Sequence, residues 1–186
     1  EKRGFLPEMM EELYEQRKQY KSLMIETQKK QEKDKSVDYS NDISRYNNIQ
    51  LARKVQLNSA YGALGNQYFR YYDIRQAEAI TKAGQLSIRW IEDRVNQYLN
   101  KLLKTDDVDY VIASDTDSIY VTLEALVDKA FSGGYDDHPE SVNKVINFLD
   151  TVASDKLEPY IDRCYQELAD YMNAYDQKMF MKREVI

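Results

Sequence analysis

One apolar stripe restricts the fold of this chain more than any other feature of its sequence. Apolar or small residues recur at helical spacing between residues 74 and 102, namely Ile74, Ala77, Ile80, Gly84, Ile88, Ile91, Val95, Leu99 and Leu102. This pattern predicts one long helix, which Asp73 can cap at its N-terminus. A long helix with a single apolar face needs a second layer of structure to cover that face.

The residues that follow the stripe can supply that layer. Residues 110–113 and 119–123 are rich in strand-forming residues and flank a polar tip, so they predict a β-hairpin. A short helix is expected over residues 126–131. A longer helical pattern starts at Pro139 and resumes at residue 160, with a kink at Pro159. The final stretch, residues 179–186, can start a further strand.

Two more helical segments precede the stripe. Apolar residues recur at helical spacing over residues 7–27, and a second helix is expected over about residues 43–61. The polar stretch between them predicts an exposed tip, so the two helices should form an antiparallel hairpin. The fold class is therefore α+β. The expected ends of these helices are Pro7 as a first residue, Asn41 or Asp42 as a cap, and Gly62 and Gly65 as a terminus.

Charge is distributed unevenly along the 186 residues, which carry a net charge of −6. Residues 1–66 contain 12 Lys and Arg against 10 Asp and Glu, whereas residues 67–186 contain 14 against 22. A basic arm that holds an anion, facing an acidic half with a cation site, would give this distribution. With one cysteine and one histidine, the chain offers neither an internal disulfide nor a Cys/His zinc site. No apolar run approaches the ~20 residues of a membrane span.

Asp115 and Asp117 lie at the tip of the expected β-hairpin, in the sequence YVIASDTDSIYVTL. In an extended backbone such residues point to the same side, so their carboxylates would repel unless a cation lay between them. A ligand set made only of oxygen suits Mg²⁺ or Mn²⁺. Taken alone, however, the Asp-x-Asp pattern favours an ordinary turn, because Asp is common in turns.

Cationic and polar residues on the helical hairpin change this weighing. Lys54, Asn58 and Tyr61 share one face of the second helix, and Arg17 and Lys21 lie four residues apart on the first. Packed antiparallel, the two helices could aim three cations at one phosphate chain. Lys21 alone would be better explained as a solvated surface charge. For Lys54 that explanation is weaker, because little other charge follows it.

Three segments together resemble the motifs of family B DNA polymerases. KVQLNSAYGALGN (54–66) resembles the fingers motif K-x-x-x-N-S-x-Y-G, SDTDSIYV (114–121) resembles the palm motif D-T-D-S, and YEQRKQYK (14–21) resembles the first fingers helix. They occur in the family's order, and the resemblance covers nearly the whole chain. FRYYDIRQAEAIT (69–81) and LEPYIDR (157–163) are similar in particular to the replicative polymerases of T-even-type phages.

The resemblance implies roles for the residues of the helical hairpin. Arg17, Lys21 and Lys54 would bind the phosphates of the incoming deoxynucleoside triphosphate, and Asn58 would support that site. Lys54 would also protonate the leaving pyrophosphate as a general acid. The nascent base pair would be lined by Tyr61 and Gly62.

For the acidic tip, the resemblance implies two Mg²⁺ ions, with Mn²⁺ as an alternative, in phosphoryl transfer to a primer 3′-hydroxyl. Asp117 would be the principal metal ligand, and Asp115 a weaker or indirect one. Ser114 replaces a usual Gly, and Lys182 a usual acidic residue in the phage relatives. Glu184 matches a carboxylate near the palm site, without an assigned role.

The resemblance also implies a domain division, with fingers over residues 1–66 and part of the palm over 67–186. The palm sheet would be incomplete, because the motif D-x-x-S-L-Y-P, which carries the other metal-binding Asp, is expected upstream of residue 1. We therefore expect no polymerisation by the chain alone. The expected partners are primer-template DNA, a dNTP and the exonuclease, palm and thumb segments of the same polymerase, with a sliding clamp as a candidate. The expected location is the cytoplasm, which is that of the host cell if the protein is phage-encoded.

Two other hypotheses stay open. The chain could be a non-catalytic helical module that binds a nucleotide or polyphosphate through Arg17, Lys21 and Lys54, which would not depend on a metal at Asp117. It could also be a purely structural helical protein with an incidental Asp turn. Charge reversal at Lys54 or Asp117 would then change only local stability.

Overall fold

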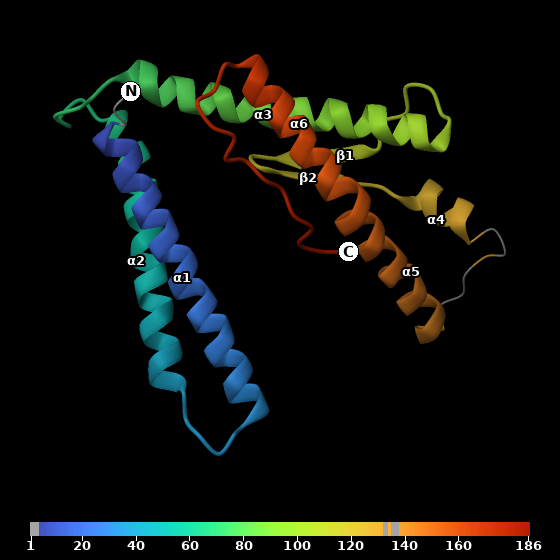
Figure 1. The fold of residues 1–186 in the computed structure, drawn as a ribbon, viewed down its shortest axis with the longest axis horizontal. Coiled ribbons are helices and arrows are strands. Elements are labelled where there is room, and N and C mark those ends of the chain that lie inside the picture. The colour runs from blue at the N-terminus through green and yellow to red at the C-terminus, as the bar shows by residue number, and fades with distance from the viewer. Residues whose placement is uncertain (1–3, 132–133, 135–137) are drawn as a thin grey trace. The chain divides into compact units, whose positions relative to one another are not determined.

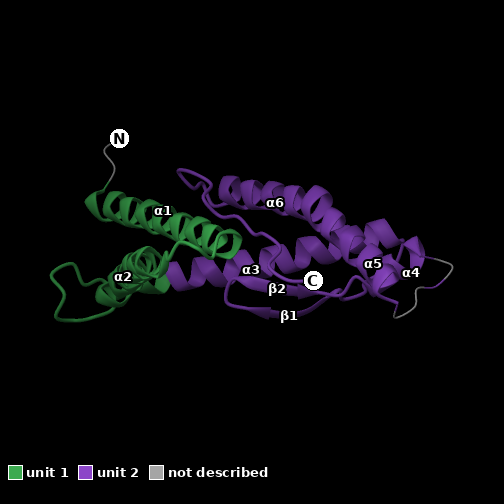
Figure 2. Cartoon of the chain, turned by 90° about the horizontal axis from the view of Figure 1, so that it is seen from below, with its two compact units in different colours: residues 1–79 green, residues 80–186 purple. Residues whose placement is uncertain are grey.

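A computed structural model describes residues 4–131, 134 and 138–186 and shows a mostly helical chain with one small antiparallel sheet (Figure 1). It divides into two units, residues 1–79 and 80–186 (Figure 2). The combination of helices with a small antiparallel sheet confirms the predicted α+β fold class. No helix among the described residues is long and apolar enough to cross a membrane. The elements are α1 (Phe5–Lys33), α2 (Ser40–Leu64), α3 (Ile74–Leu103), β1 (Val111–Asp115), β2 (Ser118–Val121), α4 (Glu124–Ala130), α5 (Pro139–Val152), the π-helix η1 (Ala153–Leu157) and α6 (Glu158–Tyr171).

Helices α1 and α2 pack against each other as the predicted antiparallel hairpin of the first unit (Figure 1). Gln31 links the end of α1 to the segment that leads into α2. Its side-chain amide donates a hydrogen bond to the carbonyl of Val37 at 3.0 Å, and its side-chain oxygen accepts one from the N–H of Tyr39 at 2.7 Å. Further along the hairpin, the rings of Tyr20 and Tyr46 lie 6.3 Å apart between centroids. These contacts link the two helices along the hairpin.

The ends of the two helices differ from the predictions. Helix α1 begins at Phe5, which makes Pro7 its third residue. Proline is tolerated there because the first N–H groups of a helix have no intrahelical partner. The cap predicted at Asn41 or Asp42 is wrong, since both lie inside α2. Asp38 instead accepts hydrogen bonds from the N–H and hydroxyl of Ser40, at 2.9 and 2.6 Å, and so orders the first turn.

At its other end α2 continues through Gly62, so the predicted termination at this residue is wrong. The helix ends at Leu64, and Gly65 is its C-cap with a right-handed backbone. Glycine inside a helix costs up to about 1 kcal/mol relative to alanine. Leu64 is buried one half-turn later. Burial of that side chain can offset the cost and favours the longer helix.

The prediction for α3 holds at its start. The Asp73 carboxylate accepts a hydrogen bond from the N–H of Arg75 at 3.0 Å, as a capping residue does. It also pairs with the Arg75 guanidinium, and this hydrogen bond is the largest cause that lowers the pKa of Asp73. Only part of the predicted stripe is buried. Ile91, Val95 and Leu99 are inaccessible, whereas Ile74, Ile80 and Leu102 are about half exposed, because the described core of the second unit lies against the central and later turns of α3.

The core of the second unit joins α3 to the β-hairpin and to α6. Its buried members are Ile91, Val95, Leu99, Tyr110, Val111, Leu157, Ile161, Cys164, Tyr165 and Leu168. Strand β1 pairs with β2 in the register Val111 to Val121 and Asp115 to Ser118, with an irregularity between Val111 and Ala113. Within the described residues each strand pairs only with the other. The acidic tip of the hairpin is therefore supported by a core that holds α3 and α6 together.

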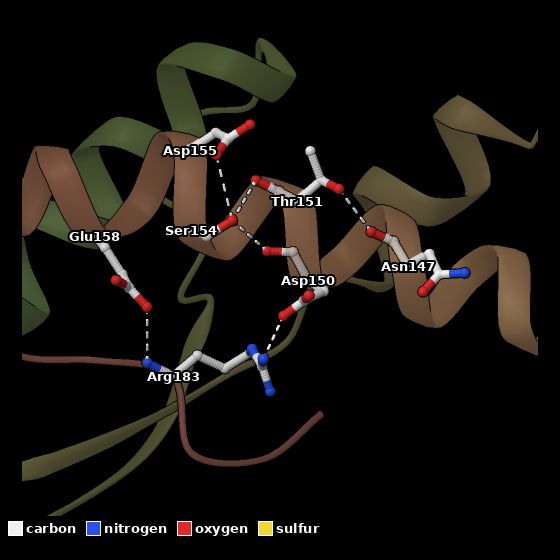
Figure 3. Close-up of polar contacts among 7 residues, drawn as sticks. All are labelled: Asn147, Asp150, Thr151, Ser154, Asp155, Glu158 and Arg183. Carbon is white, nitrogen blue, oxygen red and sulfur yellow. Dashed lines mark hydrogen bonds and ion pairs between the residues drawn. The ribbon is translucent and has the colours of Figure 1, made fainter.

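Helices α5 and α6 are joined through the π-helix Ala153–Leu157, just before the residue where a kink was predicted. Pro159 has no N–H, and its ring crowds the carbonyl one turn earlier, so the helix widens there. Arg183 bridges this segment from the end of the chain (Figure 3). Its N–H donates to Glu158 Oε1 at 3.1 Å, and its guanidinium forms an ion pair with Asp150.

The strand predicted over residues 179–186 is not observed. Instead the segment is attached to the second unit by side chains. Met181 packs against the core, Met179 Sδ accepts a hydrogen bond from the Ser87 hydroxyl at 3.3 Å, and Arg183 makes the contacts described above. A strand needs a neighbouring strand to pair with its backbone, and none of the described strands pairs with this segment.

We expect Leu99→Ala to lower the free energy of unfolding of the second unit by roughly 2–5 kcal/mol, because it leaves a cavity at an inaccessible position. Urea denaturation followed by circular dichroism measures this. Leu102→Ala on the same helix is the matched control, because that side chain is 44% exposed, and it should cost at most about 0.5 kcal/mol. Equal losses for the two variants would contradict the described core.

Candidate functional site

The acidic tip is a tight turn rather than an extended segment. Asp115 is the last residue of β1 and pairs with Ser118, and the N–H of Asp117 donates to the carbonyl of Asp115 at 2.6 Å. Thr116 between them has φ = 54°, which is rare for a β-branched residue and costs of order 1–3 kcal/mol. The extended backbone assumed in the sequence argument is therefore wrong here. Both aspartates nevertheless lie in one turn, exposed to solvent.

The two carboxylates differ in their local contacts. Asp115 Oδ1 accepts a hydrogen bond from the Thr116 hydroxyl at 2.9 Å. The carboxylate of Asp117 accepts none from the described residues. Exposed oxygen donors of this kind suit a hard divalent cation such as Mg²⁺. Among the described residues, however, no group of three or more His, Cys, Asp or Glu could hold a metal ion. The two carboxylates alone could therefore supply at most part of a ligand set.

Tyr165 on α6 connects the tip to the core. It is buried at 5% exposure, and burial is the main cause that raises the pKa of its hydroxyl, to which the negative charges of Asp117 and Asp162 add. The Asp117 carboxylate therefore acts electrostatically on a buried group of α6. Tyr165 was not a predicted site residue, and it lies in the helical pattern that resumes at residue 160.

The cationic and polar residues that were predicted to bind a ligand lie on α1 and α2. Lys54, Asn58 and Tyr61 are all exposed on α2. On α1, Lys21 is exposed and Arg17 is half-buried. Gly62 follows Tyr61, and a Cβ added to it would meet nothing within 4 Å. Its backbone is thus open to close approach by another molecule.

The structure adds Arg53, which the sequence argument did not single out. This residue is half-buried, and its Nε atom, like that of Arg17, is inaccessible to solvent and has no hydrogen-bond partner among the described residues. Its Nη1 donates to Gln56 Oε1 at 2.8 Å. The signal in the sequence was its spacing, because Arg53 continues the row of half-buried residues on α2.

The candidate residues therefore form two sets. The first, on the helical hairpin, belongs to the unit of residues 1–79, and the second, at the acidic tip, belongs to the unit of residues 80–186. The first set can hold an anion through Arg and Lys. The second can hold a cation through carboxylates.

Comparison with known proteins gives consistent matches. The family model of DNA polymerase family B matches residues 1–149. The DNA-directed DNA polymerase of Enterobacteria phage T4 is 47% identical over 140 residues, which are 75% of this chain and 15% of that protein. That of Escherichia phage RB69 is 46% identical over 137 residues, 74% of this chain and 15% of that protein. The DNA polymerase alpha catalytic subunit of Mus musculus is 32% identical over 149 residues, 79% of this chain and 9% of that protein. The chain thus spans 15% or less of the length of these relatives.

We expect Thr116→Asn to stabilise the β-hairpin by roughly 1 kcal/mol, because Asn tolerates a positive φ better than a β-branched residue does. Amide hydrogen exchange over residues 118–121 measures this. Thr122→Asn is the control, since Thr122 has no positive φ to relieve. Faster exchange in Thr116→Asn than in the unchanged chain would contradict strain at this turn.

Asp117→Asn should lower the pKa of Tyr165, because removing the nearby negative charge eases loss of the hydroxyl proton. A pH titration of the Tyr165 ring signals by NMR measures this, with Asp128→Asn on α4 as the control. The folded pKa of Tyr165 lies above its ordinary value of 10.0. Its contribution to stability is therefore present below pH 10 and is lost as pH rises through the folded pKa. An unchanged Tyr165 pKa would contradict the proximity of Asp117.

Proposed function

Since this chain belongs to DNA polymerase family B, we propose that it is the nucleotide-binding and partial metal-binding portion of a template-directed DNA polymerase that acts in replication. The observation that carries this proposal is the match of the motifs to the structural elements. Two of them lie on the facing helices of one hairpin, and the third lies at the exposed tip of the β-hairpin. In this proposal residues 1–66 are the fingers and residues 67–186 part of the palm.

On the fingers, Arg17, Lys21 and Lys54 bind the triphosphate of the incoming deoxynucleotide. Three cations offset the charge of the phosphate chain, and the Arg fork can bind two of its oxygens at once. Lys54 donates a proton to the pyrophosphate as it leaves, which is general acid catalysis. Its exposure on α2 supports this role, because the proton must reach a bound ligand. Asn58, one turn further along, supports the same site.

Tyr61 and Gly62 line the nascent base pair in this proposal. Tyr61 is 47% exposed, one turn beyond Asn58 on the same helix. The space around Gly62 supports the assignment, because a base pair could approach its backbone without meeting a side chain. Geometric selection of a base pair requires such a close, flat contact.

At the palm tip, Asp117 and Asp115 hold the divalent metal, with Mg²⁺ as the proposed ion and Mn²⁺ as an alternative. When bound, two such ions would activate the primer 3′-hydroxyl and offset the charge of the reacting phosphate. The described residues offer no group of three or more such ligands. We therefore assign the remaining ligand to another palm segment of the same polymerase, and propose that the chain alone does not polymerise.

The proposed partners follow from this assignment. They are primer-template DNA, a dNTP and the exonuclease, palm and thumb segments, with a sliding clamp as a further candidate. The limited ligand set at the tip also suits a second candidate function, a nucleotide-binding module without catalysis. The two candidates differ in whether Asp117 is needed for chemistry.

We expect Asp117→Ala and Lys54→Ala, made in the polymerase that contains this chain, to slow primer extension with Mg²⁺. Lys54→Ala should lower kcat by roughly 10²–10⁴-fold, the range of a general acid. Asp117→Ala should lower it by roughly 10³-fold or more, because charge stabilisation at the reacting phosphate is lost. Single-turnover extension measures both.

Lys29→Ala and Asp128→Ala are the matched controls, because both residues are exposed and have no assigned role. Extension at the unchanged rate by both Asp117→Ala and Lys54→Ala would remove the catalytic site from this chain. Loss of nucleotide binding in Lys54→Ala without loss of turnover in Asp117→Ala would favour the non-catalytic module.

A further inference from the structure

The packing of α1 against α2 follows one continuous seam. Along each helix a set of buried and half-buried residues recurs at alternating spacings of four and three, as in the packed helices of a coiled coil. The seam consists of Leu6, Met10, Leu13, Arg17, Tyr20, Met24, Thr27 and Gln31 on α1, and Ile43, Tyr46, Gln50, Arg53, Leu57, Ala60 and Leu64 on α2. Two arginines therefore occupy positions that normally hold apolar side chains.

The contacts across the hairpin place these two arginines within about one turn of the same level. At the tip, Gln31 is hydrogen-bonded to the N–H of Tyr39. Equal steps away from this contact along the two antiparallel helices lead to Arg17 on α1 and to Arg53 on α2. The ring contact between Tyr20 and Tyr46 agrees with this register to within about one turn.

Acidic residues are scarce around the two arginines in the sequence, although Glu11 on α1 is half-buried. Residues 43–72 contain no Asp or Glu at all. On α1, Glu15 is the acidic residue nearest to Arg17 in the sequence, and it is exposed and lies 3.9 Å from Lys18. Neither arginine forms an ion pair with any described residue, and the Nε atoms of both are buried without a partner. Buried donors without partners call for a missing acceptor.

We propose that Arg17 and Arg53 form a two-sided clip in the seam for one phosphate group of a polyphosphate chain. Arg53 is then a further ligand-binding residue, beside the Arg17, Lys21 and Lys54 already assigned. Two guanidinium forks can bind the several oxygens of one phosphate, and a doubly charged anion offsets their mutual repulsion. The identity of the ligand as nucleotide triphosphate or pyrophosphate rests on the proposed function.

The neighbours of the clip favour a chain of phosphates over a single carboxylate. Lys54 directly follows Arg53, and Lys21 lies one turn beyond Arg17. Both lysines are exposed, whereas both arginines are half-buried. The site thus offers an inner pair of rigid forks and an outer pair of mobile point charges. Such a gradient fits a ligand with one buried phosphate and further phosphates towards solvent.

The test is thermal unfolding of the 186-residue chain with sodium pyrophosphate, dATP or sodium orthophosphate at matched ionic strength. The melting temperature of the unchanged chain should rise with pyrophosphate or dATP, because a ligand of the folded state stabilises it. Arg53→Leu should weaken the binding of these anions at least tenfold. Without anion it should melt no lower than the unchanged chain, since leucine suits a seam position. Arg45→Leu, at an exposed position of α2, is the matched control and should bind normally.

The outcomes separate the clip from the proposed function. Normal anion binding by Arg53→Leu, or no rise for the unchanged chain, would overturn the clip, while Lys54-dependent primer extension would still support the polymerase assignment. A rise with pyrophosphate and not with dATP would support a clip that takes the product, and a rise with both would support the incoming nucleotide. If Arg53→Leu does not fold, Arg53→Lys is the substitute, because it keeps the charge without the guanidinium fork. Arg53→Lys should bind pyrophosphate or dATP several-fold more weakly than the unchanged chain. Normal binding of these anions by Arg53→Lys would overturn the clip. In the polymerase, either variant should raise KM for dNTP more than it lowers kcat, which a purely structural role would not produce.

Discussion

Burial of one face of α3 is the interaction on which the second unit depends. Ile91, Val95 and Leu99 are inaccessible, and the β-hairpin and α6 cover them. Both strands of the hairpin are short and pair only with each other among the described residues, and such a two-stranded sheet is marginal in water by itself. The apolar contact with α3 therefore keeps the acidic tip in place. Because the core fixes the hairpin, its tip can keep two like charges close together.

The two candidate sites share one physical principle, which is that like charges are held together by structure built elsewhere. At the tip, a tight turn at Thr116 keeps Asp115 and Asp117 within three residues, at a cost in backbone strain. In the first unit, an apolar seam on either side of Arg17 and Arg53 holds the hairpin closed around them. In each case the unfavourable charge arrangement would be relieved by a ligand of opposite sign. Such sites are pre-organised for their ligands and weakly stable without them.

Much of the fold could be predicted from the sequence, because the periodic pattern of a helix depends on residues close together in the chain. The long helix at Ile74–Leu103, its Asp73 cap and the helical hairpin are of this kind. The failures arose where distant contacts decided the outcome. Gly62 lies inside α2, and burial of Leu64 favours this longer helix. Residues 179–186 are not a strand, because side-chain contacts hold them where no described strand pairs with them. Neither contact is visible in the local sequence.

In the candidate site, too, local patterns could be predicted and features that depend on distant contacts could not. Residue types and order predicted Lys54, Asn58 and the aspartate pair as candidates, because these motifs are local. Arg53 escaped notice because its charge suggested a surface residue, and only the register of α1 against α2 makes it a seam residue. A half-buried arginine at an apolar seam position, with a buried donor that has no partner, indicates a binding site more strongly than an exposed cluster of charges does. Exposed charges are solvated at little cost, whereas buried ones need a partner to exist at all.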